Sequence, residues 1–321
     1  MTWPKAYGGH ERSAFERYLV QEELLAAGAP VAAHWIADRQ SGPLLLRYGT
    51  EEQRKTFLPR IAAGDCFFCI GMSEPDSGSD LAATRTRAVP VEGGFRVNGA
   101  KVWTSHAHEA HFMVLFCKTG TGHERHADAS QFIVDLRAAG IEIRPIRILT
   151  GEHHFNEVVF RDAFLPHSSL VGTQGGGWSQ VMSELVFERS GPERFLSSFP
   201  LLASLVEEVG PEHSSSAPAD IGRLVAQLIV LRQLSRSVAG VLDTGGEPAV
   251  EASIVKDIGT GFEQLVPEIA RKLVSIDLAA RENREFAAAF ACTQYHAPSF
   301  SLRGGTREIL RGIIARGLGL R

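Results

Sequence analysis

The sequence has few cysteines and little excess of charge of either sign. It contains 4 cysteines in 321 residues, too few for a disulfide framework in a chain of this length. Lys and Arg total 33 against 37 Asp and Glu, which gives a net charge of −4. A protein that follows a phosphate backbone would usually carry a basic patch or stripe. We therefore expect no nucleic-acid partner.

Long apolar runs are also missing. The longest ones, such as Leu228 to Leu231, fall far short of the ~20 residues that a membrane-spanning helix needs. The segment from Met1 to Gly9 lacks the order of charged, apolar and small residues that marks a secretory signal. We expect a cytoplasmic protein without a membrane partner.

The composition, with 44% hydrophobic and 22% charged residues, is typical of a globular protein. The length of the chain predicts more than one domain, and the hydrophobic period changes twice along it. The predicted fold is α+β and multidomain. We expect an N-terminal α-helical domain (1–66), a middle antiparallel β-barrel (67–170) and a C-terminal bundle of the four-helix type (171–321).

The first region has a helical pattern. Phe15, Leu19 and Leu24 recur at helical spacings before Gly28. Thr50 followed by Gln53 has the form of a capping box, and it predicts a helix that continues through Ile61 and closes at Gly64.

The middle region has short β-rich runs between turn residues. Gly93-Gly94 predicts a hairpin, and Asn98-Gly99 predicts a second turn before a strand over 100–103. Further strands are expected at His111 to Lys118, Gln131 to Leu136, Ile141 to Ile146 and Asn156 to Phe160. Roughly seven strands at this spacing indicate a compact antiparallel barrel or sandwich.

The last region returns to helical periodicity. Two apolar stripes predict long helices, and long helices joined by short loops indicate an antiparallel bundle. The first stripe contains Leu224, Leu228, Leu231 and Leu234, and the second contains Ile254, Ile258, Phe262, Leu265, Ile269 and Leu273.

One segment carries most of the chemical information. From Gly71 to Ala83 the sequence reads GMSEPDSGSDLAA, a strand end entering a turn whose hydroxyls and N–H groups suit a phosphate or a heterocycle edge. The segment resembles the motif of the acyl-CoA dehydrogenases. Four further stretches resemble that family in its order: Trp3 to Gly9, Tyr48 to Gln53, Asn98 to Ser105 and Gly304 to Ile309. The resemblance covers essentially the whole chain, but starts a few tens of residues into the family's usual length, so the first N-terminal helices are expected to be absent.

The resemblance implies an FAD-dependent oxidoreductase of lipid and fatty acid catabolism. Such an enzyme removes hydrogens from Cα and Cβ of an acyl-CoA thioester to give the trans-2-enoyl-CoA. A glutamate takes the α-proton, and N5 of the flavin receives the β-hydride. An electron-transferring flavoprotein is the implied acceptor, and a homodimer or tetramer, or a heteromeric assembly, is the implied state.

The family's base comes from one of two positions. Gly304 stands at the first, where a carboxylate would be needed, and Glu188 stands at the second, in Leu185-Val186-Phe187-Glu188-Arg189. We therefore expect Glu188 to be the base. The alternative is a structural glutamate paired with Arg189 or Arg194.

The resemblance also assigns the cofactor contacts. Met72 and Ser73 are expected at the pyrimidine side of the isoalloxazine, Ser79 beside the pyrophosphate, Trp103 and Ser105 at the ring face and edge, and Thr306 and Glu308 at the adenosine part. The alternative for Glu308 is a helix N-terminal carboxylate favoured by the macrodipole. Ser79 and Arg189 are candidate substrate contacts.

Some family features are missing. The family often grips the neighbouring subunit's FAD with an Arg and a Phe-Gly in the loop that is 214–221 here, and with a later Gln-x-x-Gly-Gly. That loop lacks the usual residues, and no Gln-x-x-Gly-Gly appears before Ser299. Asp220 with Arg223, and Gln294, are weak stand-ins. Two alternatives follow: a non-catalytic partner subunit of a heteromeric dehydrogenase, or an acyl-CoA oxidase using O2. His106, His108 and His111 lack a supporting acid pattern, so we expect no metal.

Overall fold

A computed structural model describes residues 1–120, 127–210, 217–275 and 284–320, without the side chains at 32, 33, 185 and 186. The chain forms two compact units. The sheet unit comprises Met1–Glu11 and Ala32–Glu184, and the helical unit comprises Arg12–Val31 and Leu185–Arg321. The loop 214–221 was expected to lack part of the usual grip on a neighbour's FAD, and its residues 214–216 lie outside the described residues.

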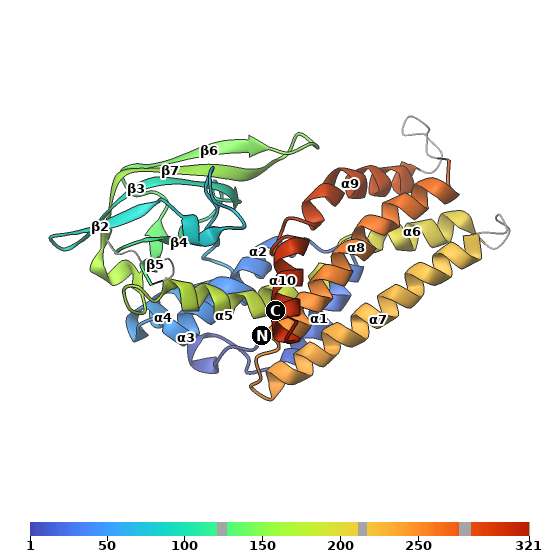
Figure 1. Cartoon of the computed structure of the whole chain (residues 1–321), viewed down its shortest axis with the longest axis horizontal. Coiled ribbons are helices and arrows are strands. Elements are labelled where there is room, and N and C mark those ends of the chain that lie inside the picture. The colour runs from blue at the N-terminus through green and yellow to red at the C-terminus, as the bar shows by residue number, and fades with distance from the viewer. Residues whose placement is uncertain (121–126, 211–216, 276–283, 321) are drawn as a thin grey trace. The chain divides into compact units, whose positions relative to one another are not determined.

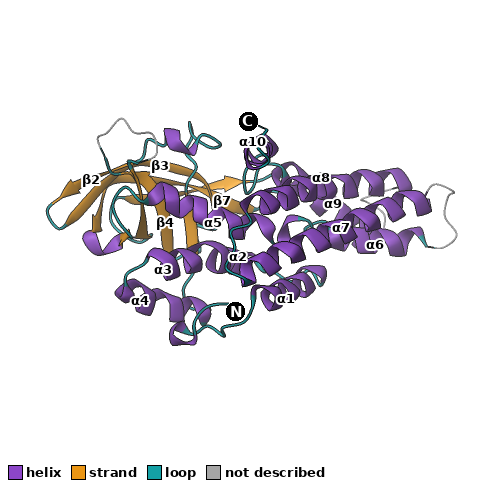
Figure 2. Ribbon diagram, turned by 60° about the horizontal axis from the view of Figure 1, so that its bottom comes forward, coloured by secondary structure: helices purple, strands orange, loops and turns teal. Residues whose placement is uncertain are grey.

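The sheet unit contains one mixed sheet (Figures 1 and 2). Its strands are β1 (Phe68–Gly71), β2 (Arg87–Val91), β3 (Gly94–Ser105), β4 (Phe112–Lys118), β5 (Ala129–Asp135), β6 (Ile141–Arg147), β7 (His153–Pro166) and β8 (Leu170–Val171). Their order is β6-β7-β3-β2-β4-β5-β8, with β1 beside β4. The path does not close from β6 to β8 among the described residues, so the expected barrel is not confirmed. Pairing is antiparallel except that β4 runs parallel to β1 and β2.

Apolar side chains cover both faces of the central strands. One core lies among the strands themselves and includes Phe95, Met113 and Phe132. A second core joins β1, β4, β5 and β8 to the helices through residues such as Leu44 and Leu58. The helices of this unit are η1 (Lys5–Tyr7), α2 (Ala32–Ile36), η2 (Ala37–Ser41), α3 (Gly42–Tyr48), α4 (Glu51–Ala62), η3 (Leu81–Ala83), η4 (His167–Ser169) and most of α5 (Gly177–Ser190).

Local signals of the sequence are found in this unit with one exception. Thr50 and Gln53 form the reciprocal capping box at the start of α4, and β2 and β3 form the hairpin around Gly93. The turn predicted at Asn98-Gly99 is wrong, because β3 continues through it to Ser105. Gly99, at φ 144°, lies in a register shift against β7, and the side chain of Asn98 accepts a hydrogen bond from the N–H of Asp162. The additional residue of this register shift is on β7, between Phe160 and Ala163, so Asn-Gly here lies opposite a bulge instead of forming a turn.

The helical unit is a set of long antiparallel helices (Figure 1). Its helices are α1 (Ala14–Ala26), the end of α5, η5 (Pro192–Arg194), α6 (Phe199–Val209), α7 (Ala217–Asp243), α8 (Ala249–Leu273), α9 (Arg284–Phe300) and α10 (Arg307–Gly317). The two long helices predicted from the apolar stripes are α7 and α8, which pack against each other.

The buried faces of two helices differ from the prediction. On α1, Leu19 and Leu24 are exposed, and the buried face contains Arg17, Tyr18 and Glu22. The Arg232 guanidinium binds both Glu22 oxygens at 2.6 and 2.7 Å. The buried face of α1 therefore contains a paired carboxylate, whereas the prediction had placed leucines there. On α8, Ile258 is exposed while polar residues are buried.

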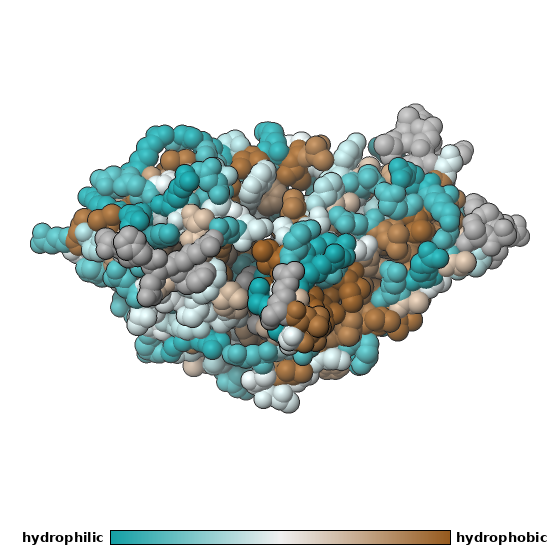
Figure 3. All heavy atoms as spheres, in the orientation of Figure 1, coloured by the Kyte–Doolittle hydropathy of each residue, from teal (hydrophilic) through white to brown (hydrophobic). Residues whose placement is uncertain are grey.

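Exposed apolar side chains gather on the helical unit (brown in Figure 3). On α7 they include Val225, Ile229 and Val230. By length and composition alone α7 could cross a membrane, but it packs on α1 and α8 and Arg232 on it is ion-paired to Glu22. The core helix of a globular bundle passes the same length test.

Candidate functional site

A buried ion pair fixes the turn that follows β1. The Lys101 Nζ, from β3, donates to Glu74 Oε1 at 2.8 Å and to the Met72 carbonyl at 2.9 Å. Glu74 also accepts hydrogen bonds from the Thr84 hydroxyl and from the N–H groups of Arg85 and Thr86. Burial raises the pKa of Glu74, but Lys101 and these donors outweigh burial and bring it to about 2. The turn carrying Met72 and Ser73 is therefore rigidly attached to β3.

The end of β3 presents Trp103 to solvent. Side chains two residues apart on a strand normally share a face, yet Lys101 is fully buried and Trp103 is 59% exposed. The reason is a register shift against β7 between Lys101 and Thr104, with Trp103 at φ 57°. A non-glycine residue with positive φ, in the left-handed backbone region, is strained and often marks a functional site.

Four of the predicted cofactor residues come together here. The Val102 N–H donates to the Ser73 carbonyl at 2.9 Å, which holds the Met72-Ser73 turn beside the segment from Trp103 to Ser105. Met72, Ser73 and Ser105 are half-buried, and Ser79 is exposed in the same loop as Glu74. The sequence missed the roles of Glu74 and Lys101, which hold this arrangement from inside.

Histidines pack behind the same bulge. The His108 and His153 rings stack at 3.7 Å between centroids, and Asn156, fully buried, contacts both of them and donates to the Thr104 carbonyl. Burial and the neighbouring His153 lower the pKa of His108. Across the part of the chain that is described, no group of three or more His, Cys, Asp or Glu is arranged to hold a metal ion.

In the helical unit, Glu188 forms an ion pair at the end of α5. Arg194 donates from Nη2 to Glu188 Oε1 at 3.0 Å and from Nε to the Glu188 carbonyl at 2.6 Å. The exposed fractions of the two side chains are 4% for Arg194 and 16% for Glu188. The pairing with Arg194 that the structural alternative required is therefore present, and the carboxylate is half-buried.

Arg189 lies against the glycines that precede α10. Its Nε donates to the Gly304 carbonyl at 3.1 Å, and its Nη2 would lie 3.2 Å from a Cβ at Gly305. Burial lowers the pKa of Arg189, and the negative charge of Glu188 only partly offsets this by raising it. The segments 188–194 and 303–305 thus form one cationic corner with Glu188 in it.

A second polar cluster on α8 was missed by the sequence analysis. Lys256 Nζ donates to the Thr260 hydroxyl at 2.5 Å and to the Phe300 carbonyl at 2.7 Å. Glu263 binds Arg303 through both oxygens, at 3.0 and 2.8 Å. Burial and the nearby Arg194 and Arg303 lower the pKa of Lys256 to about 7. The signal was the spacing of Lys256, Thr260 and Glu263, which places them on one helix face.

Thr306 and Glu308 lie at the start of α10. Thr306 is its N-cap residue, with φ −67° and ψ 158°. The pKa of Glu308 is lowered by a hydrogen bond from the Glu308 backbone N–H and, to a smaller extent, by one from the Thr306 hydroxyl. A carboxylate in the first helical turn is favoured by the macrodipole, so Glu308 fits the helix-terminal alternative.

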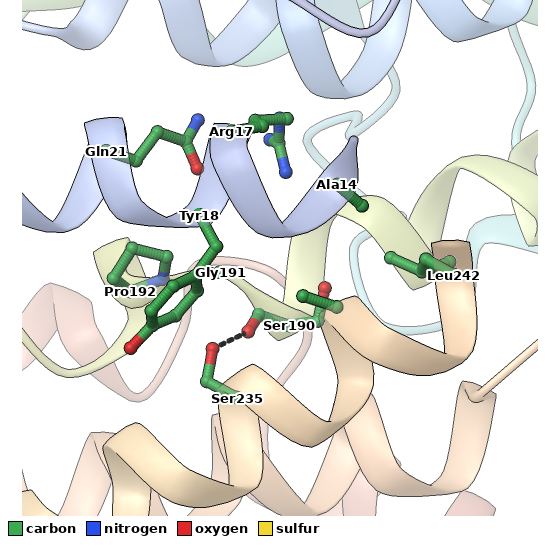
Figure 4. Close-up of a pocket in the computed structure, with 10 residues that line it drawn as sticks. Ala14, Arg17, Tyr18, Gln21, Ser190, Gly191, Pro192, Ser235 and Leu242 are labelled. Carbon is green, nitrogen blue, oxygen red and sulfur yellow. Dashed lines mark hydrogen bonds between the residues drawn. The ribbon is translucent and has the colours of Figure 1, made fainter. Parts of the chain in front are cut away.

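A narrow pocket adjoins the end of α5 within the helical unit (Figure 4). It is partly open to solvent, and its walls come from α1, the turn at Ser190 to Pro192, and α7. The Ser235 hydroxyl on α7 donates to the Ser190 carbonyl (dashed in Figure 4). This hydrogen bond fixes the chain two residues after Glu188.

Comparisons with known proteins identify three matching segments. They are the acyl-CoA dehydrogenase N-terminal domain (residues 1–65), middle domain (69–163) and C-terminal domain (218–319). Acyl-CoA dehydrogenase IpdE1 of Mycolicibacterium smegmatis is 34% identical over all of this chain and 84% of its own length. Acyl-CoA dehydrogenase FadE34 of Mycobacterium tuberculosis is also 34% identical, and the chain spans 44% of it.

Solved structures agree with these matches. The Tcur3481-Tcur3483 steroid ACAD has a TM-score of 0.91 at 28% identity, covering 100% of this chain and 85% of that one. The ChsE4-ChsE5 complex from Mycobacterium tuberculosis has a TM-score of 0.88 at 30% identity, covering 100% and 86%. The three domain matches and these relatives show that this chain belongs to the acyl-CoA dehydrogenases, a family of FAD-dependent oxidoreductases.

Proposed function

We propose that the chain catalyses the α,β-dehydrogenation of an acyl-CoA thioester to the trans-2-enoyl-CoA, with Glu188 as the base. The observation that carries this proposal is the half-buried carboxylate of Glu188, held in place by Arg194. A base must be within hydrogen-bond reach of the proton it takes and must be held in a fixed direction.

The residues of the sheet unit fit FAD. An exposed indole on a strained backbone, next to a turn fixed by the Glu74–Lys101 pair, offers a flat face with polar groups beside it. Met72, Ser73, Trp103 and Ser105 would hold the isoalloxazine, and Ser79 the pyrophosphate. Thr306 and Glu308 would contact the adenosine part. When bound, FAD supplies the two-electron acceptor for the β-hydride.

The reaction divides between the two hydrogens. The Cα–H bond breaks and its proton goes to the Glu188 carboxylate. The electron pair left at Cα forms the Cα=Cβ bond as the β-hydride is transferred to FAD. Arg189, beside Glu188, and Ser79 are the proposed contacts of the acyl-CoA. An electron-transferring flavoprotein then accepts the electrons.

The test is anaerobic addition of acyl-CoA thioesters of graded length to the purified FAD-loaded protein. We expect the flavin absorbance to bleach and the 2-enoyl-CoA to form. Glu188→Gln should retain FAD and lower the reduction rate by about 10³-fold, within the range of general acid–base catalysis. Normal bleaching by this variant would refute the assignment. Rapid re-oxidation of the reduced protein by air would indicate an oxidase.

A heteromeric partner role is the second candidate. Two solved relatives are named as pairs of proteins, Tcur3481-Tcur3483 and ChsE4-ChsE5, and Gly304 removes one of the family's two base positions. If the chain alone binds no FAD and a second family chain restores both binding and bleaching, the partner role replaces the catalytic one.

A further inference from the structure

Arg194 binds Glu188 at two points. One guanidinium reaches both the side-chain Oε1, at 3.0 Å, and the main-chain carbonyl of the same residue, at 2.6 Å. A guanidinium is planar and its N–H groups diverge at fixed angles. Attachment to both side chain and main chain therefore restricts the torsions of Glu188 in a way that a point charge could not.

Gly304 provides the space for this guanidinium. It lies at φ 70°, and a Cβ there would stand 3.1 Å from both Cζ and Nη2 of Arg194. That separation is tighter than ordinary van der Waals contact, so a side chain at position 304 would require the guanidinium to shift by a few tenths of an ångström. The Gly304 carbonyl also accepts the hydrogen bond from Arg189. One residue thus positions both arginines of this corner.

The neighbouring ion pair shows what a purely structural arrangement looks like. Glu263 is fully buried, binds Arg303 through both oxygens, and also accepts a hydrogen bond from the Ser197 N–H at 3.0 Å. Glu188 keeps 16% of its side-chain surface exposed, and Arg194 contacts Oε1. The first arrangement buries a carboxylate completely, whereas the second leaves one partly exposed.

We infer that Arg194 is a positioning residue that aims the Glu188 carboxylate at the substrate, and that position 304 requires glycine to admit its guanidinium. This inference rests on the proposed function of Glu188. Arg194 transfers no proton itself. It acts through the direction of the carboxylate that receives the α-proton.

Isotope effects on flavin reduction test this inference. Arg194→Met should lower the reduction rate of the FAD-loaded protein about 100-fold, the cost expected for a small misplacement of a catalytic group. It should also raise the α-deuterium isotope effect, because proton abstraction becomes the slow step. The affinity for the 2-enoyl-CoA, measured by calorimetry, should change less than about 3-fold, since ground-state binding is preserved.

Arg194→Lys separates charge from geometry. Lysine keeps the positive charge but cannot reach both oxygens in one plane. We expect a melting temperature close to that of the wild type, with a reduction rate still about 10-fold low. Arg232→Met, which breaks the Arg–Glu pair between α7 and α1, is the control for a general loss of stability. It should leave the α-deuterium effect unchanged.

Gly304→Ala tests the steric half of the inference, and Gly245→Ala is its matched control. Gly245 has φ 76°, close to the 70° of Gly304, but a Cβ there meets nothing within 4 Å. Both substitutions impose similar backbone strain. Only Gly304→Ala should slow flavin reduction and raise the α-deuterium effect.

The outcomes separate the two proposals. If the wild type is not bleached by any acyl-CoA, or if Glu188→Gln is bleached normally, the proposed function fails. If Glu188→Gln is inactive while Arg194→Met reduces at the wild-type rate with an unchanged α-deuterium effect, this inference alone is overturned. Equal slowing by Gly304→Ala and Gly245→Ala would also overturn it.

Discussion

Each compact unit buries one lysine completely, and the two lysines are held differently. Lys101 binds a carboxylate, Glu74, at 2.8 Å in the sheet unit. Lys256 binds a hydroxyl and a carbonyl in the helical unit, with Arg194 and Arg303 nearby. Burial lowers the pKa of both lysines. For Lys101 the charge of Glu74 opposes the effect of burial on the pKa. Around Lys256 the arginines add to that effect, and the carboxylates of Glu263 and Glu188 oppose it less strongly.

Lys101 is thus a permanently paired structural anchor, whereas Lys256 can change its charge near neutral pH. The first pair holds the turn that carries Met72 and Ser73. The second lies beside the cationic corner around Glu188 and holds the end of α9, just before Arg303 and Gly304. Three predictions test this contrast.

Lys101→Met should have the largest effect. It leaves the Glu74 charge buried without its cation, and breaking one side of a buried pair costs about 3–5 kcal/mol. Urea denaturation of the full chain at pH 7 measures this loss. The double variant Glu74→Gln, Lys101→Met should recover part of the stability, because no charge then stays buried. A single variant as stable as the wild type would show that the pair does not anchor the turn.

Acid stability should depend on Glu74. Its pKa is about 2 in the folded chain against an ordinary 4.5, so the folded state binds the proton less readily than the unfolded state. Its contribution is complete above pH 4.5 and is lost as the pH falls toward 2, by about 3 kcal/mol. Glu74→Gln should flatten this decline in denaturation midpoints. Glu142→Gln removes an exposed carboxylate whose pKa is also lowered, by its hydrogen bond with Arg144, and should change the decline far less because solvent screens that pair.

Lys256 should affect stability at neutral to alkaline pH. Its pKa is about 7 when folded against an ordinary 10.5, so between these values the unfolded state binds more protons. Stability should rise with pH across this interval by up to about 1.4 kcal/mol per pH unit, and be independent of this group below pH 7. Lys256→Met should remove the rise in urea midpoints between pH 7 and 10. The same slope in wild type and variant would contradict the shift.

Two elements were predicted correctly from local signals in the sequence. The capping box at Thr50 and Gln53 and the hairpin at Gly93 each depend on residues within a few positions of one another. Asn98-Gly99 has the same local chemistry as a turn, but pairing with β7 decided the outcome. Tertiary contact overrode propensity there.

The buried polar residues could not be found by a search for apolar periodicity. Ile258 was assigned to the core of α8, while Lys256 and Thr260, four residues apart, are the buried ones. Polar groups enter a core when they find partners there, and the partner, the Phe300 carbonyl, is 44 residues away. The motif located the turn at Met72 and Ser73 and the helix end at Glu188. Arg194 entered the sequence analysis only as a partner in the structural alternative, because its contact with Glu188 depends on the turn and the short helix η5 that follow α5.

The register shift near the end of β3 has an evolutionary consequence. Between Lys101 and Thr104, β3 has one more residue than the β7 segment it pairs with. The buried Lys101 and the exposed Trp103 are therefore only two positions apart on the same strand. A single-codon insertion in an ordinary alternating strand is enough to create such a platform. An exposed aromatic platform thus arises in this strand without any new loop, and a one-codon deletion would remove the register shift while leaving the sheet in register elsewhere.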